Sequence, residues 1–222
     1  MPILNMIYWA TWWGGWWWQP WANTIAYYPL TSTTQWTDQS WNGRDLTNSG
    51  VTFWTYQWVD CWQFNWGWLL SYNLTIPTDW TIIWWVYHDN VSENQVAFDI
   101  WWALATGRDC LGYYYNPGSD YIVLWQFHWW YETGRSINIT GQWTNVCITY
   151  TAGNDVLYIN WLPMITRSDT ISFRSDIWLW TFDQSTVGLY WWMSNIIFED
   201  KVRTVQEIID YYNQTKWNYW IS

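Results

Sequence analysis

The chain is short of positive charge, with 8 Lys and Arg residues against 18 Asp and Glu and a formal net charge of −10. Such an acidic protein repels phosphate backbones, so nucleic-acid binding is not expected. Basic amphipathic stretches, which are typical of segments that bind anionic membrane surfaces, are also missing. The longest apolar runs, such as Trp80 to Tyr87, fall well short of the ~20 residues of a membrane-spanning helix. We therefore expect no membrane insertion.

Cysteine and histidine are scarce, with 3 Cys and 2 His in 222 residues. Cys61, Cys110 and Cys147 form no CxxC pair and are odd in number, so we expect buried small apolar residues rather than a disulfide framework. His88 and His128 are isolated from one another and from any cluster with the spacing of metal ligands. The sequence therefore does not predict a zinc site.

Glutamate is equally rare and occurs only at Glu93, Glu132, Glu199 and Glu207. Hydrolysis of a glycosidic bond needs two carboxyl groups held roughly 5–9.5 Å apart across a cleft. None of the four glutamates has an aspartate two residues further on, and the adjacent Glu199 and Asp200 would point to opposite faces of a strand. We therefore predict that the protein is not an enzyme.

Glycine is scarce and tryptophan abundant, with 12 and 30 residues respectively. Many tryptophans stand where turn chemistry favours glycine. Asn160-Trp161 separates two strand-like runs, a place where Asn-Gly is the strongest hairpin signal, and Trp41 lies within a run of turn formers. We hypothesise that many of them are glycines encoded by UGA, a codon that some genomes read as glycine. The alternative is a Trp-rich sugar-binding protein. The hypothesis predicts that Trp41 and Trp161 lie at turns, largely exposed.

Three parts are predicted along the chain. Residues 1–22 form an extension in which the Trp/Gly tract 12–18 acts as a linker, and read as polyglycine this tract would be a flexible tether. Residues 23–216 form the main domain and residues 217–222 a C-terminal tail. The first residues lack the positive region of a secretory signal, so no Sec signal peptide is expected.

From Thr24 onward, short apolar or alternating runs are bounded by Gly, Pro, Asn, Asp and Ser, a pattern typical of strands. So many short strands without intervening helices favour an all-β sandwich or jelly roll. The predicted strands are Thr24–Tyr28, Val51–Tyr56, Val59–Phe64, Leu69–Tyr72, Trp80–His88, Gln95–Ala103, Cys110–Tyr115, Tyr121–Phe127, Ser136–Ile139, Thr144–Tyr150, Val156–Asn160, Ile171–Phe173, Ile177–Phe182 and Leu189–Phe198.

One helix is predicted, near the C-terminus. Thr204 and Glu207 have the spacing of a capping box, in which a hydroxyl and a carboxylate satisfy free amides of the first turn. The stripe Val205, Ile208, Ile209 and Tyr212 follows at i, i+3, i+4 and i+7 and is expected to face the sandwich.

Five motifs follow one another along the chain: Ile25–Leu30 with Asp38–Gly43 ("Y-P-L/F … D-x-S-G-N-G"), Phe64–Leu69 ("F-N-G-G-x-L"), Thr81–Val86, Gln142–Val146, and Ser194–Phe198 with the helix Glu207–Tyr212 ("E-I-x-x-Y-Y"). Together they resemble the LamG-like jelly-roll domains of the concanavalin A-like lectin/glucanase superfamily, over about residues 24–216. Trp41, Trp66 and Trp161 stand where the family pattern has glycine, whereas Trp85 and Trp143 match family tryptophans and are expected in the core.

The resemblance implies a concanavalin A-like β-sandwich with one short C-terminal helix. It implies a non-catalytic carbohydrate-binding or recognition module, whose partner is a glycan or a protein within a larger assembly such as a virion or a cell surface. The alternative is a structural phage domain, for a tail or a capsid decoration, or an adhesin domain without a small ligand. A glycoside hydrolase of the same fold is third and is disfavoured, because the sequence has no paired-carboxylate motif.

Two sets of residues are candidates for binding. Asp38-x-Ser40-x-Asn42-Gly43 resembles the first half of a calcium loop, and Asp38 with Asn42 would be the ligands. The twelfth position is Ser49 rather than glutamate, and the alternative is an Asx-turn in which these side chains bind their own backbone.

Sugar recognition combines aromatic faces with polar groups, and two strand ends offer both. Half-buried sheet residues are the alternative at both places. The candidate ligand-binding residues are Tyr87, Asp89 and Asn90 at one strand end and Tyr113, Tyr115 and Asn116 at the other.

Overall fold

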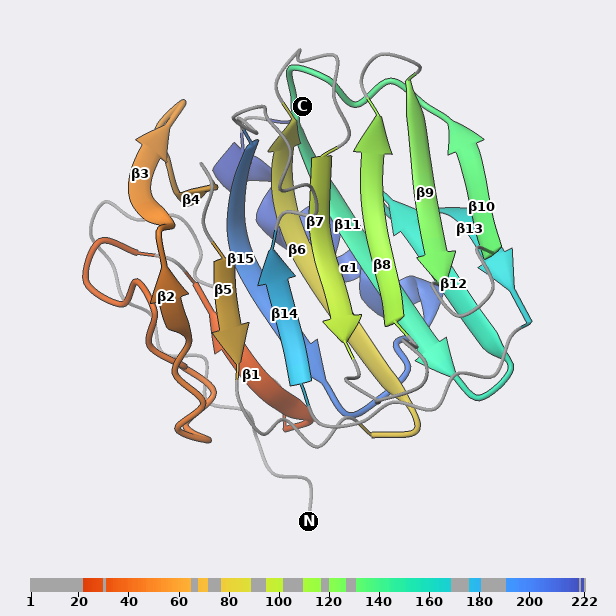
Figure 1. Cartoon of the computed structure of the whole chain (residues 1–222), viewed down its shortest axis with the longest axis horizontal. Helices are drawn as coiled ribbons and strands as arrows, with labels where there is room; N and C mark the ends of the chain where they lie inside the picture. Colours follow the sequence, from red (N-terminus) through yellow and green to blue (C-terminus); the bar gives the residue numbers. More distant parts are fainter. Residues whose placement is uncertain are drawn as a thin grey trace.

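The computed structural model describes residues 22–29, 31–64, 68–71, 77–88, 95–101, 110–116, 120–126, 131–168, 176–180, 191–219 and 221. They form two antiparallel sheets stacked face to face, with one helix on the outer side of the first sheet (Figure 1). This arrangement confirms the predicted all-β sandwich with a short C-terminal helix.

The first sheet has eight strands in the order β13-β12-β11-β6-β15-β4-β3, and β1 pairs with β15 outside this path. Its central strand β6 pairs with β11 on one side and β15 on the other. The strands are β1 Thr24–Tyr28, β3 Thr52–Tyr56, β4 Val59–Phe64, β6 Trp80–His88, β11 Trp143–Thr151, β12 Asn154–Ile159, β13 Leu162–Arg167 and β15 Trp191–Glu199.

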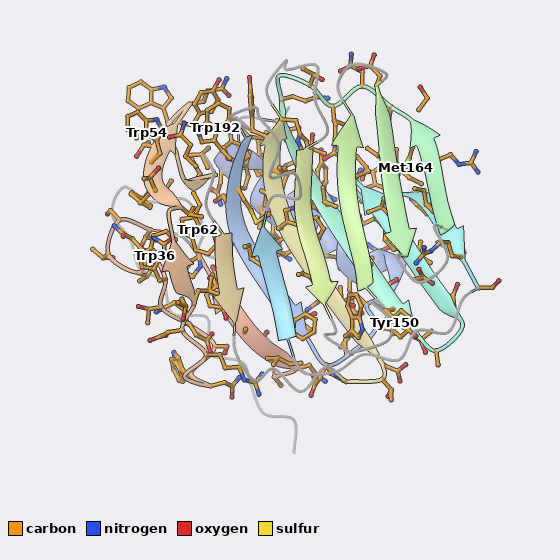
Figure 2. All side chains as sticks on the ribbon, in the orientation of Figure 1. Trp36, Trp54, Trp62, Tyr150, Met164 and Trp192 are labelled. Atoms are coloured by element: carbon orange, nitrogen blue, oxygen red, sulfur yellow. The ribbon has the colours of Figure 1, made fainter. Side chains whose placement is uncertain are left out.

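The second sheet has seven strands in the order β10-β9-β8-β7-β14-β5-β2 and lies in front of the first in Figure 1. Its strands are β2 Thr47–Ser49, β5 Trp68–Ser71, β7 Gln95–Trp101, β8 Cys110–Asn116, β9 Tyr121–Gln126, β10 Tyr131–Ser136 and β14 Asp176–Trp180. The edge strands β10 and β13 are joined by a hydrogen bond from Arg135 Nε to the carbonyl of Met164 (3.2 Å), which connects the two sheets. Met164 is labelled in Figure 2.

Most predicted strands are observed, and three of them, Thr24–Tyr28, Val59–Phe64 and Trp80–His88, have the observed bounds. The strand predicted at Ser136–Ile139 is wrong, because β10 ends at Ser136 and Ile139 is a buried residue of the following segment. Strands β2, β10 and β13 were not predicted. The predicted strand Ile171–Phe173 lies outside the described residues.

The inner core lies between the two sheets. On β6 the alternate residues Trp80, Ile82, Trp84 and Val86 belong to it, together with Ile122 of the second sheet. This alternation follows from strand geometry, in which successive side chains point to opposite faces. Burial of these side chains on one face holds the two layers together.

The opposite face of the first sheet is covered by helix α1 (Val205–Thr215), which lies behind this sheet in Figure 1. Ile83 of β6 and Ile197 of β15 form a second apolar cluster with Ile208 and Tyr211 of the helix. All nine residues of β6 are buried because the strand is covered on both faces.

The capping box of α1 is confirmed. The Thr204 hydroxyl accepts a hydrogen bond from the Glu207 amide (3.3 Å), and the Glu207 carboxylate accepts one from the Thr204 amide (2.9 Å). The predicted stripe is partly wrong, since Val205 is exposed and Tyr211 is fully buried. The face of the helix that packs on the sheet is rotated from the predicted one, so that Tyr211 rather than Val205 packs beside Ile208.

Candidate functional site

The loop that follows β1 is organised by Asp38, which was predicted as a calcium ligand. Its Oδ1 accepts hydrogen bonds from the amides of Tyr27 (3.0 Å) and Ser40 (2.8 Å). Its Oδ2 accepts hydrogen bonds from the Ser40 hydroxyl (2.8 Å) and the Arg44 amide (3.1 Å). The bond to the amide two residues further on is the Asx-turn pattern.

Asn42, the second predicted calcium ligand, fastens the same loop to β1. Its Nδ2 donates hydrogen bonds to the carbonyls of Thr24 (3.1 Å) and Ile25 (2.9 Å). Arg44 Nη1 also donates to the Ile25 carbonyl (3.2 Å). The geometry favours the Asx-turn interpretation for Asp38, whereas the Asn42 amide binds the backbone of β1 rather than its own. Calcium binding by Asp38 and Asn42 stays a prediction for a titration to test.

Tyr87 was predicted to bind a ligand at the end of β6, but its ring lies inside an aromatic cluster. It meets Tyr56 (ring centroids 4.8 Å), Trp192 (5.4 Å) and Trp143 (5.9 Å) edge-on, and it is 6% exposed. The Tyr56 ring stacks on Trp192 at 3.9 Å. These contacts support the alternative of a packed sheet residue, since an enclosed ring has no face left for a sugar.

The other candidates lie at the neighbouring strand end. In Figure 1 the arrowheads of β6 and β8 both lie at the upper edge of the sandwich, although the two strands belong to different sheets. Tyr113 pairs with Leu124, Tyr115 with Ile122, and Asn116, the last residue of β8, with Tyr121. The structure thus places the ends of these two strands at one edge of the molecule.

Asp89 and Asn90 lie outside the described residues. They directly follow His88, the last residue of β6. Their predicted role in ligand binding stays a prediction.

Both glutamates whose side chains the structure describes make structural contacts. Glu199 is buried and accepts bidentate hydrogen bonds from Arg203, and its Oε1 also accepts one from the Thr24 hydroxyl (3.4 Å). Burial raises the pKa of the Glu199 carboxyl to about 7, against the lowering influence of Arg203. Such an enclosed pair joins β15 to the start of the helix and offers no surface to a substrate.

Glu207 belongs to the helix cap. Partial burial raises its pKa, but hydrogen bonds from Lys201 and from the Thr204 amide and hydroxyl outweigh this and lower the pKa to about 2. The carboxylate is therefore ionised at neutral pH, as a cap at the positive end of a helix requires. Glu93 lies outside the described residues.

Cys61 and Cys147 are free and buried, as predicted. Burial raises the pKa of the Cys61 thiol to about 12, which makes it unreactive at neutral pH. Among the residues that the structure describes, no group of three or more His, Cys, Asp or Glu side chains is arranged to hold a metal ion. Within the same residues, no helix has the length and apolar character needed to cross a membrane.

Trp85 and Trp143 are buried, which confirms their predicted place in the core. The Trp85 ring stacks on Tyr219 (4.1 Å, interplanar angle 14°) and on Tyr212 (5.8 Å) of the C-terminal segment. Tyr219 belongs to the predicted tail 217–222, yet it lies in the 3-10 helix η1 (Lys216–Tyr219) and is packed against the sheet.

Trp41, predicted at a turn, is 92% exposed. Trp161 also lies in a turn, but it is only 37% exposed and so less open than expected. Sequence reasoning did not single out Trp54 and Trp58 of the β3–β4 hairpin, which are 55% and 88% exposed. Trp66 and the tract 12–18 lie outside the described residues.

Comparison with solved structures gives many similar folds. One example is the binding domain of botulinum neurotoxin serotype D, with 12% identity and a TM-score of 0.68 over 86% of this chain and 50% of that one. Another is a structure of botulinum neurotoxin type C, whose cell entry is described as dependent on interaction with two ganglioside molecules. It has 14% identity and a TM-score of 0.68 over 86% of this chain and 51% of that one. A third is the binding domain of botulinum neurotoxin DC in complex with rat synaptotagmin II, with 15% identity and a TM-score of 0.69 over 86% of this chain and 51% of that one.

This chain spans about half the length of the solved chains it matches. At such low identities the likeness establishes the fold alone. No protein-family model matches the sequence, and no curated protein matches it significantly.

Proposed function

We propose that the chain is a non-catalytic recognition module of the LamG-like, concanavalin A-like type, which binds a glycan or a partner protein within a larger assembly. The observation that carries the proposal is the two-layer sandwich, which matches about half the length of chains described as binding or receptor-binding domains. One of those proteins is described with gangliosides and another with synaptotagmin II, so both glycan and protein partners occur among proteins that contain this fold.

Three of the described carboxyl groups are engaged in structural contacts, which fits a binding rather than a catalytic role. Glu199 is enclosed with Arg203, and Glu207 is engaged in the helix cap. Asp155 is likewise buried in an ion pair with Arg167. A glycosidase needs two free carboxyl groups that face each other across a cleft. These three residues do not provide such a pair.

The shared edge where β6 and β8 end is our candidate for the glycan-binding surface. Asn116 is the last residue of β8, and Asp89 and Asn90 follow β6 in the chain. Amide and carboxylate groups are suited to the hydroxyls of a sugar. Tyr113 and Tyr115 of β8 remain candidates for the aromatic part of this surface, whereas Tyr87 is occupied in the packed cluster.

A glycan array tests this function directly. The full chain is applied in the presence of calcium and then of a chelator, and specific binding is expected for a defined set of glycans. Asn116→Ala, and separately Asp89→Ala with Asn90→Ala, should reduce this binding at least tenfold. The matched control is Asn154→Ala, because Asn154 is exposed and pairs with Thr151 at the opposite end of the first sheet.

Binding lost in chelator would support calcium at Asp38 and Asn42, and binding unchanged in chelator would favour the Asx-turn interpretation. No glycan binding under either condition would contradict the glycan-binding function. The alternative of a structural virion or adhesin domain would then be favoured, and co-purification of capsid, tail or cell-surface proteins would test it.

A further inference from the structure

Among the residues that the structure describes, three tryptophans have a left-handed backbone. The φ angles of Trp41, Trp58 and Trp161 are 70°, 67° and 68°, next to φ values of 67° to 84° for the glycines with positive φ. In this region the Cβ atom of an L-residue meets the neighbouring backbone, so a bulky residue there is a genuine outlier. Glycine, without a Cβ, adopts the same conformation freely.

Two of these tryptophans hold the second position of a two-residue hairpin turn. Gln57-Trp58 joins β3 to β4 with φ of 48° and 67°, and Asn160-Trp161 joins β12 to β13 with φ of 47° and 68°. Positive φ at both central residues is the signature of a type I′ turn, whose second position is typically glycine. The two hairpins thus share one backbone geometry and one unexpected residue.

At Trp41 and Trp58, packing does not compensate for this backbone strain. The side chains of Trp41 and Trp58 are 92% and 88% exposed, so burial of the indole contributes little stability at these positions. A strained backbone persists only where the surroundings enforce it. An exposed indole at the tip of a turn supplies no such enforcement.

Trp85 and Trp143 behave differently. Both lie within strands of the first sheet, both are buried, and both pack against Tyr219. Here the large ring fills the space between the sheet and the C-terminal segment. The tryptophans of the described chain therefore include one group that needs the indole and one group whose backbone needs glycine.

We propose that positions 41, 58 and 161 are glycines in the natural protein, encoded by UGA codons that its source reads as glycine, while positions 85 and 143 are true tryptophans encoded by UGG. Position 58 emerges from the backbone geometry alone, since Gln57 is not a typical partner of glycine in a turn. One consequence is that indole rings at these three turns do not form part of any sugar-binding surface.

Paired substitutions test the backbone argument. Trp41, Trp58 and Trp161 are each replaced by Gly and, separately, by Ala in the full chain. Both changes remove the indole, but only Gly relieves the strain of positive φ, so each Gly variant should melt about 2–4 °C above its Ala counterpart.

Trp217 is the matched control for these pairs. It is 66% exposed and lies in η1, and it is not among the described residues with positive φ. Gly there should melt below Ala, because glycine weakens a helical backbone. The same order of Gly and Ala at Trp217 as at the three turns, or no difference at the turns, would overturn the backbone argument.

The coding DNA tests the identity of the residues. UGA at 41, 58 and 161 together with UGG at 85 and 143 is expected. UGG at any of the three turn positions would refute the assignment of glycine there, whatever the melting temperatures show.

Discussion

The packing of Tyr219 gives the sharpest stability prediction. Its ring is 5% exposed, stacks on Trp85 at 4.1 Å and meets Trp143 at 5.2 Å. Its hydroxyl donates a hydrogen bond to Ser194 Oγ (3.1 Å), which in turn donates to the carbonyl of Asp60 (2.9 Å). Tyr219→Ala therefore leaves a cavity under the C-terminal segment and breaks a buried hydrogen-bond chain.

Truncating a buried aromatic residue to alanine lowers the free energy of unfolding by about 3–5 kcal/mol. Tyr219→Phe keeps the ring and removes only the hydroxyl, which should lower it by about 1 kcal/mol. Urea denaturation followed by intrinsic fluorescence measures both values. A decrease in the free energy of unfolding below about 0.5 kcal/mol for Tyr219→Ala is the level of an ordinary surface substitution. Such a result would refute the packing of this segment and would favour the predicted C-terminal tail 217–222 instead.

Four further predictions follow from the polar contacts. Thr204→Ala removes the helix cap and should lower the free energy of unfolding by about 0.5–2 kcal/mol in urea denaturation. Because the pKa of Glu207 is lowered from 4.5 to about 2, the stability that it contributes is complete above pH 4.5 and is lost as the pH falls towards 2. Melting temperatures across this range should therefore fall less steeply for Glu207→Gln than for the original chain, and parallel curves would contradict the cap.

Arg203→Met leaves the Glu199 carboxyl buried without its ion-pair partner and should lower the free energy of unfolding by about 3–5 kcal/mol. Adding Glu199→Gln should recover part of this loss, and a double variant no more stable than the single one would argue against the pairing. Asp38→Ala should lower the melting temperature equally in calcium and in chelator. A calcium-dependent melting temperature that this substitution abolishes would instead establish a calcium site.

Much of the fold could be predicted from the sequence because its signals are local. The buried run Trp80–His88 and the capping box at Thr204 depend only on neighbouring residues, and both were predicted correctly. Strand β13 was missed because it contains Pro163 and exposes most of its first half, which hides the pattern of a strand. Ile139 was assigned to a strand because burial of an apolar residue in a connecting segment gives the same local signal.

The candidate site was less predictable because it depends on long-range contacts. The hydrogen bonds from Asn42 to the carbonyls of β1 join residues 17 and 18 positions apart in the chain, so a short-range sequence pattern cannot predict them. The burial of Tyr87 could not be predicted for the same reason, because it depends on contacts with Tyr56 and Trp192 of other strands. At Trp58 the predicted strands left a two-residue connection, but Gln57 is not a usual turn former, and only the positive φ angles revealed that the position suits glycine.

Peptide mass spectrometry of the protein isolated from its natural source tests most directly the claim that the described tryptophans fall into two groups. Peptides that cover positions 41, 58 and 161 should carry glycine, with each mass lower by the difference between a tryptophan and a glycine residue. Peptides that cover Trp85 and Trp143 should carry intact tryptophan and serve as the internal control. Intact tryptophan at 41, 58 and 161 would contradict the account.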